Sequence, residues 1–400
     1  MGEGTSVKSA ITAVAAELES LAAAGRRRFL RTIDGPQQAH IMLAGRPVLL
    51  LCSNNYLALA SHPRLKAGAQ RATELDGASA GASRLISGTM RLHQELEEAL
   101  AGFKKVPRAL LFNSGYAANL ALLTTFAEAG DVIFSDALNH ASIVDGCRLS
   151  RARLAVYRHN DLDHLEELLR REGAPCRRRL IVTDSVFSMD GDLADLPGIA
   201  ELGRRYDALV MVDDAHATGV LGTRGRGSAE HFGLDSCALD LQMGTLGKAL
   251  GSCGAYVAGA APLIDYLINK ARSFIYTTAL PPAVLGASLA ALEVLDEEPW
   301  RVTRLRELAA YLRRGLTTLG IVLRNDPTPI IPVPVGDPRR TMDLSNWFLE
   351  RGVFIQGIRP PTVASGQSLL RVTVSADLEF SDLDLVLELF AERRRDFQGR

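Results

Sequence analysis

Between about residues 48 and 290, short apolar runs alternate regularly with helical patterns. The apolar runs are PVLLLCS, RALLFNS, DVIFSD, RLAVYRH, RRLIVTDS, DALVMVDD, ALDLQMG and GAYVAG. Stretches such as QELEEALAGF and LDHLEELLRRE lie between them and have helical periodicity. Strands that are apolar throughout and alternate with helices are typical of a mainly parallel sheet covered on both faces. The sequence therefore predicts an α/β fold.

The same pattern divides the chain into three segments. Residues 1–47 are expected to form one helix and a basic arm, and residues 48–290 a large α/β domain. Residues 291–400 begin with the helical pattern PWRVTRLRELAAYLRRGLTTLG, continue with NDPTPIIPVPVGDP, and end in alternating strands and helices. We expect NDPTPIIPVPVGDP to be a proline-rich link, and residues 291–400 to form a smaller α+β domain.

Charge and cysteine content exclude several classes of protein. The chain has 45 basic and 46 acidic residues, so no overall field favours nucleic acid or an anionic membrane. The five cysteines are scattered without C-x-x-C spacing, which argues against a disulfide framework and against a zinc site. No apolar run is long enough to span a bilayer. We therefore expect a globular cytoplasmic protein without a bound metal.

Lys248 is the one charged residue in GTLGKALGSCGAY, residues 244–256. A solvated loop would usually carry more charges. A phosphate loop would have Ser or Thr after the lysine to bind magnesium, but Ala249 occupies that position. A lysine with a lowered pKa can instead form a Schiff base with a carbonyl cofactor. This interpretation requires partners elsewhere in the chain.

MVDDAHATGVLG, residues 211–222, ends a buried strand with two acids and a histidine. A heterocyclic cofactor whose ring nitrogen must stay protonated needs a carboxylate beside it, and Asp213 is the candidate. His216 could donate to a phenolic oxygen of the same cofactor. Alone, Asp213 would be explained equally well as a helix cap. Together with Lys248, it favours pyridoxal phosphate.

LFNSGYAANLALL, residues 111–123, predicts a strand, a tight turn and the start of a helix. A helix N-terminus binds phosphate through free N–H groups and its dipole. Gly115 permits close approach, and Gly115 and Tyr116 are the expected amide donors. An ordinary cap by Ser114 is compatible with this role.

Two further strand ends carry candidate residues. His140, in SDALNHASIVDG, could stack on a pyridine ring, although a helix cap by Asn139 beside an incidental histidine explains the motif alone. Ser188, in TDSVFSMDGDLADLP, could bind the cofactor or simply close a turn. Ligands of open parallel sheets bind at the carboxyl ends of the strands, so all these motifs point to one site.

The motifs SGYAAN, LNHAS, SVFSMDGD, VDDAHATGVLG and TLGKALG, in this order, resemble the α-oxoamine synthases, which are fold-type I enzymes that use pyridoxal phosphate. The resemblance covers nearly the whole chain and includes SNNYLALASHP, SRLISGTMRLHQELEEALA and IYTTALPP. It implies a large domain built on a seven-stranded type of sheet, a smaller C-terminal domain, and acyl transfer to an amino acid. It also implies a homodimer with shared active sites.

The resemblance assigns a role to each matching position. Lys248 would carry the cofactor as a Schiff base, Asp213 would pair with the ring nitrogen, and His216 and Ser188 would contact the phenolic oxygen. His140 would stack on the ring and support condensation. Other positions are implied near the phosphate (Gly115, Tyr116, Thr245, and Thr278 toward the neighbouring subunit), the amino-acid carboxylate (Asn54, Arg371) and the acyl substrate (Thr362, Arg26).

One segment narrows the resemblance. IRPPTV, residues 358–363, followed by LLRVTVSA, is similar to the family branch that condenses L-alanine with pimeloyl-CoA or a pimeloyl-carrier protein in biotin synthesis. Sibling enzymes that join glycine or serine to other acyl-CoA thioesters are the alternative. Asp184 departs from the glutamate more usual in the family, which puts its reach to the site in doubt, and DGASAGASRL has alanines where relatives have more glycine.

Overall fold

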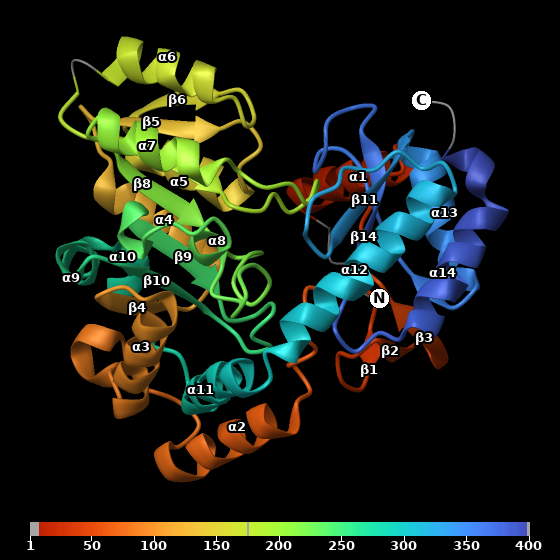
Figure 1. Cartoon of the computed structure of the whole chain (residues 1–400), viewed down its shortest axis with the longest axis horizontal. Coiled ribbons are helices and arrows are strands. Elements are labelled where there is room, and N and C mark those ends of the chain that lie inside the picture. Colours follow the sequence, from red (N-terminus) through yellow and green to blue (C-terminus); the bar gives the residue numbers. More distant parts are fainter. Residues whose placement is uncertain (1–7, 174–175, 398–400) are drawn as a thin grey trace, which may run out of the picture.

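A computed structural model describes residues 8–173 and 176–397 (Figure 1). Its large unit is built on a seven-stranded sheet of order β4-β10-β9-β8-β7-β5-β6, in which β10 runs antiparallel to both neighbours and the other pairs are parallel. The strands are β4 (Arg108–Phe112), β5 (Val132–Asp136), β6 (Arg153–Tyr157), β7 (Arg179–Asp184), β8 (Leu209–Asp213), β9 (Leu241–Thr245) and β10 (Ala255–Gly259). The predicted α/β fold with a mainly parallel sheet is confirmed.

Helices cover both faces of this sheet because its strands are apolar on both sides. One face packs against α4 (Gly115–Phe126), α5 (Ala141–Ser150), α9 (Ala261–Lys270) and α10 (Arg272–Ile275). The other packs against α6 (Leu162–Gly173), α7 (Leu196–Arg205) and the short α8 (Ser228–His231). A third apolar cluster joins α3 (Arg91–Lys104) and α11 (Pro282–Glu297) to the rest of the chain, and α2 (Pro63–Asp76) packs on α11.

The second unit lies beside the first and contains two small sheets (Figure 1). The three-stranded sheet has the order β11-β14-β13, with β11 (Ile330–Gly336), β13 (Gln356–Ile358) and β14 (Ser368–Thr373). The four-stranded sheet joins β1 (Ile33–Asp34), β2 (His40–Leu43) and β3 (Arg46–Leu50) to β12 (Val353–Phe354). The helices of this second unit are α12 (Trp300–Thr318), α13 (Pro338–Glu350) and α14 (Phe380–Glu392). The N-terminal helix α1 (Ser9–Ala23) buries no residue.

Two sequence expectations differ from this arrangement. PVLLLCS was expected in the large sheet, but β3 pairs with β2 and β12 instead, because a continuous apolar run is buried equally well between either set of partners. NDPTPIIPVPVGDP was expected to be a link, but it contains β11. This strand tolerates Pro332 and Pro334 because it pairs only with β14 and its other edge is unpaired.

No helix within residues 8–173 and 176–397 combines the length and apolarity needed to cross a bilayer.

Helices α2 and α11 approach so closely that glycine is required on both. A Cβ atom on Gly286 would lie 2.4 Å from the Gly68 carbonyl oxygen, and one on Gly68 would lie 2.6 Å from the Gly286 oxygen. Gly286→Ala should therefore lower the free energy of unfolding by about 1–3 kcal/mol, even though alanine favours the helix by about 1 kcal/mol. Thermal unfolding measures this effect. Gly102→Ala on α3 is the control, because nothing lies within 4 Å of its new Cβ; equal stability of the two variants would contradict the prediction.

Candidate active site

The site is built at the carboxyl ends of neighbouring strands. Asp136, Asp184 and Asp213 are the last residues of β5, β7 and β8, and each is buried. Strand β9 ends at Thr245, three residues before Lys248. Parallel strands end at one edge of the sheet, so this topology brings motifs that are far apart in sequence to a single place.

Lys248 lies at the centre of the arrangement. Its Nζ is 2.9 Å from Nε2 of His216. Burial lowers the pKa of the Lys248 amine to about 8, although the carboxylates of Asp213 and Asp184 favour its charged form; Arg371 lowers it further. An amine with this pKa supplies its neutral, nucleophilic form far more readily than an exposed lysine.

Asp213 is held by two hydrogen bonds. The backbone N–H of Ala215 donates to Oδ1 at 2.9 Å, and Nδ2 of Asn119 donates to Oδ2 at 2.8 Å. Both partners are donors, so each carboxylate oxygen of Asp213 accepts one hydrogen bond. Asn119 comes from the first half of α4, and it ties the end of β8 to that helix.

The two site histidines are neutral. Burial lowers the pKa of His216 well below its usual value, and the nearby Lys248 and Arg371 lower it further. Burial also lowers the pKa of His140, whose Nδ1 lies 2.7 Å from the Ser142 hydroxyl. Nδ2 of Asn119 donates to the same hydroxyl at 2.8 Å. A continuous polar chain thus joins His140 to Asp213.

An anion cradle forms where α4 begins. Ser114 caps the helix by accepting from the Ala117 N–H, and within the described residues the N–H groups of Gly115 and Tyr116 have no acceptor. A Cβ on Gly115 would lie 2.9 Å from Cγ2 of Thr245, so the absence of a side chain keeps this cradle open.

The side chains of Tyr116 and Thr278, next to the cradle, are both exposed. The Tyr116 ring is exposed, and its hydroxyl donates to Asp145. The Thr278 carbonyl accepts from Asn113 Nδ2 at 2.8 Å, which places the exposed Thr278 beside the loop leading into α4.

Arg371 and Asn54 form a second cluster on the side of the smaller unit. Arg371, on β14, donates through Nε to the Ser188 carbonyl at 2.6 Å and through Nη1 to Asn54 Oδ1 at 3.4 Å. Arg371 is 7% exposed, and within the described residues no carboxylate neutralises it. A buried, unneutralised guanidinium is suited to binding a carboxylate. Ser188 contacts Arg371 through its backbone carbonyl, whereas the contact with the cofactor's phenolic oxygen that the resemblance implies for Ser188 stays a prediction.

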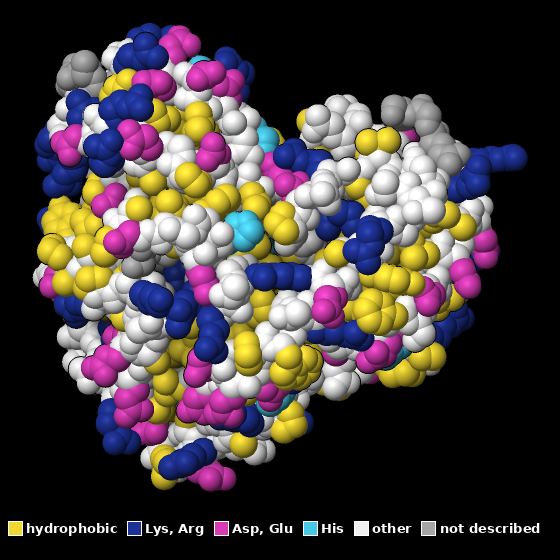
Figure 2. Space-filling view, in the orientation of Figure 1, with side chains coloured by type: hydrophobic (Ala, Val, Ile, Leu, Met, Phe, Trp, Pro, Cys, Tyr) yellow, Lys and Arg dark blue, Asp and Glu magenta, His cyan; other side chains and the backbone are white. Residues whose placement is uncertain are grey.

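A cavity of about 880 Å³ opens beside these residues, between the two units. Figure 2 shows the notch between the units, with charged side chains on its walls. Ser188 and Thr362 line the cavity. Arg26 does not: it lines a separate pocket with Arg359, while Arg28 donates to the Thr362 hydroxyl at 3.4 Å. The structure thus brings the Arg28 side chain to Thr362, and Arg26, Arg27 and Arg28 all line that separate pocket.

Asp184 reaches the site despite its short side chain. Its Oδ2 accepts from the backbone N–H of His140 at 2.7 Å. Burial, together with the charge of Asp213, raises the pKa of Asp184 well above its usual value. The acid therefore orients the start of α5, and with it the His140 side chain.

Sequence reasoning missed two residues that contact the predicted ones. Asn119 is fully buried in the otherwise apolar pattern AANLALL, and a lone amide in such a helix is a usable signal. Tyr56 is also fully buried, and its hydroxyl lies 2.8 Å from Nδ1 of His216. Its position in SNNYLALA gave no comparable signal, because a buried tyrosine there reads as core.

His159 forms a charged link beside the cavity. Its Nδ1 lies 2.9 Å from Asp136 Oδ1, and its Nε2 lies 2.7 Å from Asp192 Oδ2. Burial alone would lower the pKa of His159, but the two carboxylates together raise it to about 9. The imidazolium thus fastens the loop that carries Ser188 to the end of β5.

His159→Gln should remove a pH-dependent part of the stability. The folded-state pKa of about 9 lies above the usual 6.5, so His159 stabilises the fold fully below about pH 6.5, and this stability disappears as pH rises through 9. The free energy of unfolding of the wild type should fall by about 1–2 kcal/mol more than that of the variant across this range, because solvent screens part of the interaction of the half-buried ring. Denaturant titrations at several pH values measure the difference. Parallel pH curves for the two proteins would refute the assignment.

These residues fit pyridoxal phosphate. The cofactor requires an amine for its aldehyde, an acid for its ring nitrogen and donors for its phosphate. Lys248, Asp213 and the open N-terminus of α4 supply these three groups, and His216 lies between the amine and Tyr56. We propose that they hold the cofactor, with His140 beside its ring.

Comparison with known proteins places the chain in a family. Residues 46–390 match the family described as aminotransferase class I and II. An 8-amino-7-oxononanoate synthase from Geobacter sulfurreducens is 53% identical over 380 residues, covering 94% of this chain and 97% of that protein.

Solved structures also resemble the chain in fold. Serine palmitoyltransferase from Sphingomonas wittichii superimposes with a TM-score of 0.91 at 30% identity, covering 98% of both chains. The 8-amino-7-oxononanoate synthase from Francisella tularensis gives a TM-score of 0.76 at 30% identity, covering 87% of this chain and 98% of that one. The phosphate-loop alternative for GTLGKAL is thereby excluded. The chain belongs to the class I and II aminotransferase family of pyridoxal-phosphate enzymes and, within it, to the α-oxoamine synthases.

Proposed function

We propose that the protein condenses L-alanine with pimeloyl-CoA, or with a pimeloyl-carrier protein, to give 8-amino-7-oxononanoate, CO2 and the free thiol, in biotin synthesis. The observation that carries this proposal is the 53% identity over 94% of the chain to a relative that bears this name. The serine palmitoyltransferase superimposes with a TM-score of 0.91 but is only 30% identical to this chain. The sequence therefore favours alanine over serine.

The reaction exchanges bonds at two carbon atoms. The α-carbon of alanine loses a proton and attacks the thioester carbonyl, the C–S bond breaks, and the thiol leaves. The bond from the same α-carbon to its carboxylate then breaks, CO2 leaves, and a proton returns to the carbon. Pyridoxal phosphate, when bound, supplies the electron sink for the charge left on the α-carbon.

The chain's own residues bind, orient and move protons. Arg371 and Asn54 would bind the alanine carboxylate, and Lys248, once released, would take the α-proton and later return one as general acid. Asp213 would hold a proton on the ring nitrogen of the bound cofactor. The cavity lined by Ser188 and Thr362 would receive the acyl chain.

The test is a product assay with the purified, cofactor-loaded protein. L-Alanine, glycine and L-serine are each supplied with thioesters of several chain lengths, and the products are identified by mass spectrometry. We expect the largest kcat/KM for L-alanine with the pimeloyl thioester. A preference for glycine or serine would keep the family and overturn this substrate assignment.

We also propose a homodimer in which Thr278 approaches the partner subunit's phosphate site. Thr278 is exposed, as is the neighbouring Tyr276 at 72%. An apolar stripe of α1, with Ile11, Val14 and Leu18, also faces outward. Sedimentation at low protein concentration tests this assembly, and a stable monomer with full activity would overturn it.

The cytoplasmic location stays a prediction.

A further inference from the structure

Tyr56 connects the two halves of the site. Its hydroxyl lies 2.8 Å from Nδ1 of His216 and donates to Oδ1 of Asn54 at 3.1 Å. His216 in turn contacts Lys248, and Asn54 contacts Arg371. A chain of hydrogen bonds therefore runs from the amine that holds the cofactor to the pair that would bind the amino-acid carboxylate.

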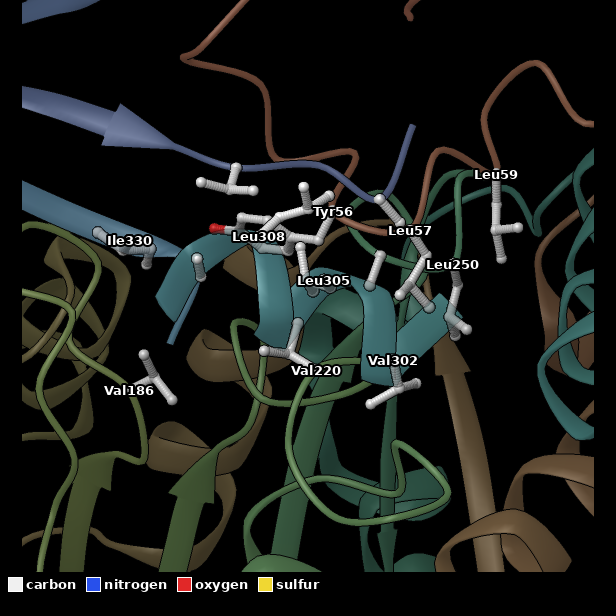
Figure 3. Packing of buried hydrophobic residues seen from close by; sticks show 14 of the residues in the cluster. Tyr56, Leu57, Leu59, Val186, Val220, Leu250, Val302, Leu305, Leu308 and Ile330 are labelled. Carbon is white, nitrogen blue, oxygen red and sulfur yellow. The ribbon is translucent and has the colours of Figure 1, made fainter. Parts of the chain in front are cut away.

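The ring of Tyr56 is fixed by the core. Figure 3 shows it packed over α12 beside Leu305 and Leu308, and the residue is fully buried. The hydroxyl hydrogen can still rotate about the C–O bond. A phenol has only one hydrogen to donate, so it must choose between Nδ1 of His216 and the Asn54 amide oxygen.

Counting donors fixes this choice in the cofactor-free chain. At neutral pH the Lys248 amine is mostly charged, so it donates to Nε2 of the neutral His216. The imidazole proton must then sit on Nδ1 and point at the tyrosine oxygen. Tyr56 is left to donate to Asn54, and this assignment accounts for each of the three contacts along the chain from Lys248 to Asn54.

Loading the cofactor reverses the demand on His216. The Lys248 nitrogen would then be bound to the cofactor and could no longer donate to His216. The imidazole of His216 would instead have to donate an Nε2–H to the phenolic oxygen of the cofactor. Nδ1 consequently becomes an acceptor, and the tyrosine hydrogen turns from Asn54 to His216. Asn54 Oδ1 would then keep its contact with Arg371 Nη1 but lose the one with Tyr56, so the amide could move with Arg371 and present its Nδ2 to a carboxylate bound there.

We propose that Tyr56 is a positioning residue whose single hydroxyl hydrogen couples cofactor loading at Lys248 to the readiness of Asn54 for the amino-acid carboxylate. This inference rests on the proposed use of pyridoxal phosphate and an amino acid. It does not depend on which amino acid or acyl group reacts. A purely structural role for Tyr56 would involve only its ring.

The test compares Tyr56→Phe with the wild type, in the full-length protein with and without cofactor. The variant keeps the buried ring and removes only the hydroxyl. Tyr256→Phe is the matched control, because Tyr256 is equally buried and its hydroxyl bonds Thr218 at 2.9 Å, away from His216 and Asn54. ¹⁵N NMR of labelled histidine, assigned by loss of the signals in His216→Gln, reports which ring nitrogen carries the proton.

We expect the wild-type proton on Nδ1 without cofactor and on Nε2 with it, and a loaded Tyr56→Phe protein that no longer populates Nε2–H alone. Dissociation constants for L-alanine, glycine and L-serine, read from the visible spectrum, should rise about tenfold in Tyr56→Phe for whichever amino acid binds, but not in Tyr256→Phe. An unchanged wild-type tautomer on loading, or equal amino-acid affinities in the two variants, would overturn the coupling. Because all three amino acids are titrated, failure of the alanine assignment alone would leave this test readable.

Discussion

Replacing Lys248 with alanine is expected to lower the rate of product formation at least about 10⁴-fold, because it removes both a covalent anchor and a general base worth about 10²–10⁴ by itself. Lys104 cannot substitute for it. Lys104 is also buried, but its Nζ is bound to Asp214 at 2.8 Å and to the Arg226 carbonyl at 2.7 Å. Single-turnover kinetics with saturating pyridoxal phosphate measure the loss.

The binding of the cofactor provides a second measurement on the same variant. Without the amine, pyridoxal phosphate should bind reversibly through Asp213 and the N-terminus of α4, and dialysis should remove it. Lys270→Ala, at the exposed end of α9, is the matched control and should keep full activity. Retention of more than a few per cent of the wild-type rate in Lys248→Ala would contradict the assigned role.

The large sheet could be predicted because each of its strands appears in the sequence as a separate apolar run. Seven of the eight runs form it, and the alternation with helices predicts the parallel pairing that all neighbouring strands show except the two pairs that β10 makes. PVLLLCS could not be placed, because β3 finds its partner β12 about 300 residues later in the chain. Strand β11 was hidden by its prolines, which only the unpaired edge of a small sheet makes acceptable.

The candidate site was predictable where chemistry and topology coincide. Lys248, Asp213 and His216 follow two adjacent strands, so their proximity follows from the sheet order. The sheet order does not place Asn119 and Tyr56, because their contacts with Asp213 and His216 span 94 and 160 residues. The lone amide of Asn119 in an apolar helix is a signal of burial, but it does not identify its partner. The role implied for Arg26 stays a prediction, and Arg28 is the arginine of this segment whose side chain bonds Thr362.

Asp213→Asn should cause the second largest loss of activity, about 10²–10³-fold in kcat. The protonated ring nitrogen of the bound cofactor would then lie in a buried site without the negative charge that Asp213 supplies. The amide is nearly the same size, so packing is unchanged. Its two ends are no longer equivalent, however. Ala215 and Asn119 both donate to the present carboxylate, and an asparagine can accept from only one of them without turning its own NH2 toward the other donor.

Asp213→Glu separates charge from geometry in this experiment. It restores the negative charge but moves it by one methylene, so activity should recover in part if the charge opposite the ring nitrogen is what matters. If Asp213→Glu were as inactive as Asp213→Asn, while both proteins bound pyridoxal phosphate normally, position rather than charge would control the rate. If Asp213→Asn kept full activity, the ring nitrogen would not need the carboxylate, and Asp213 would be only the residue that fastens β8 to α4.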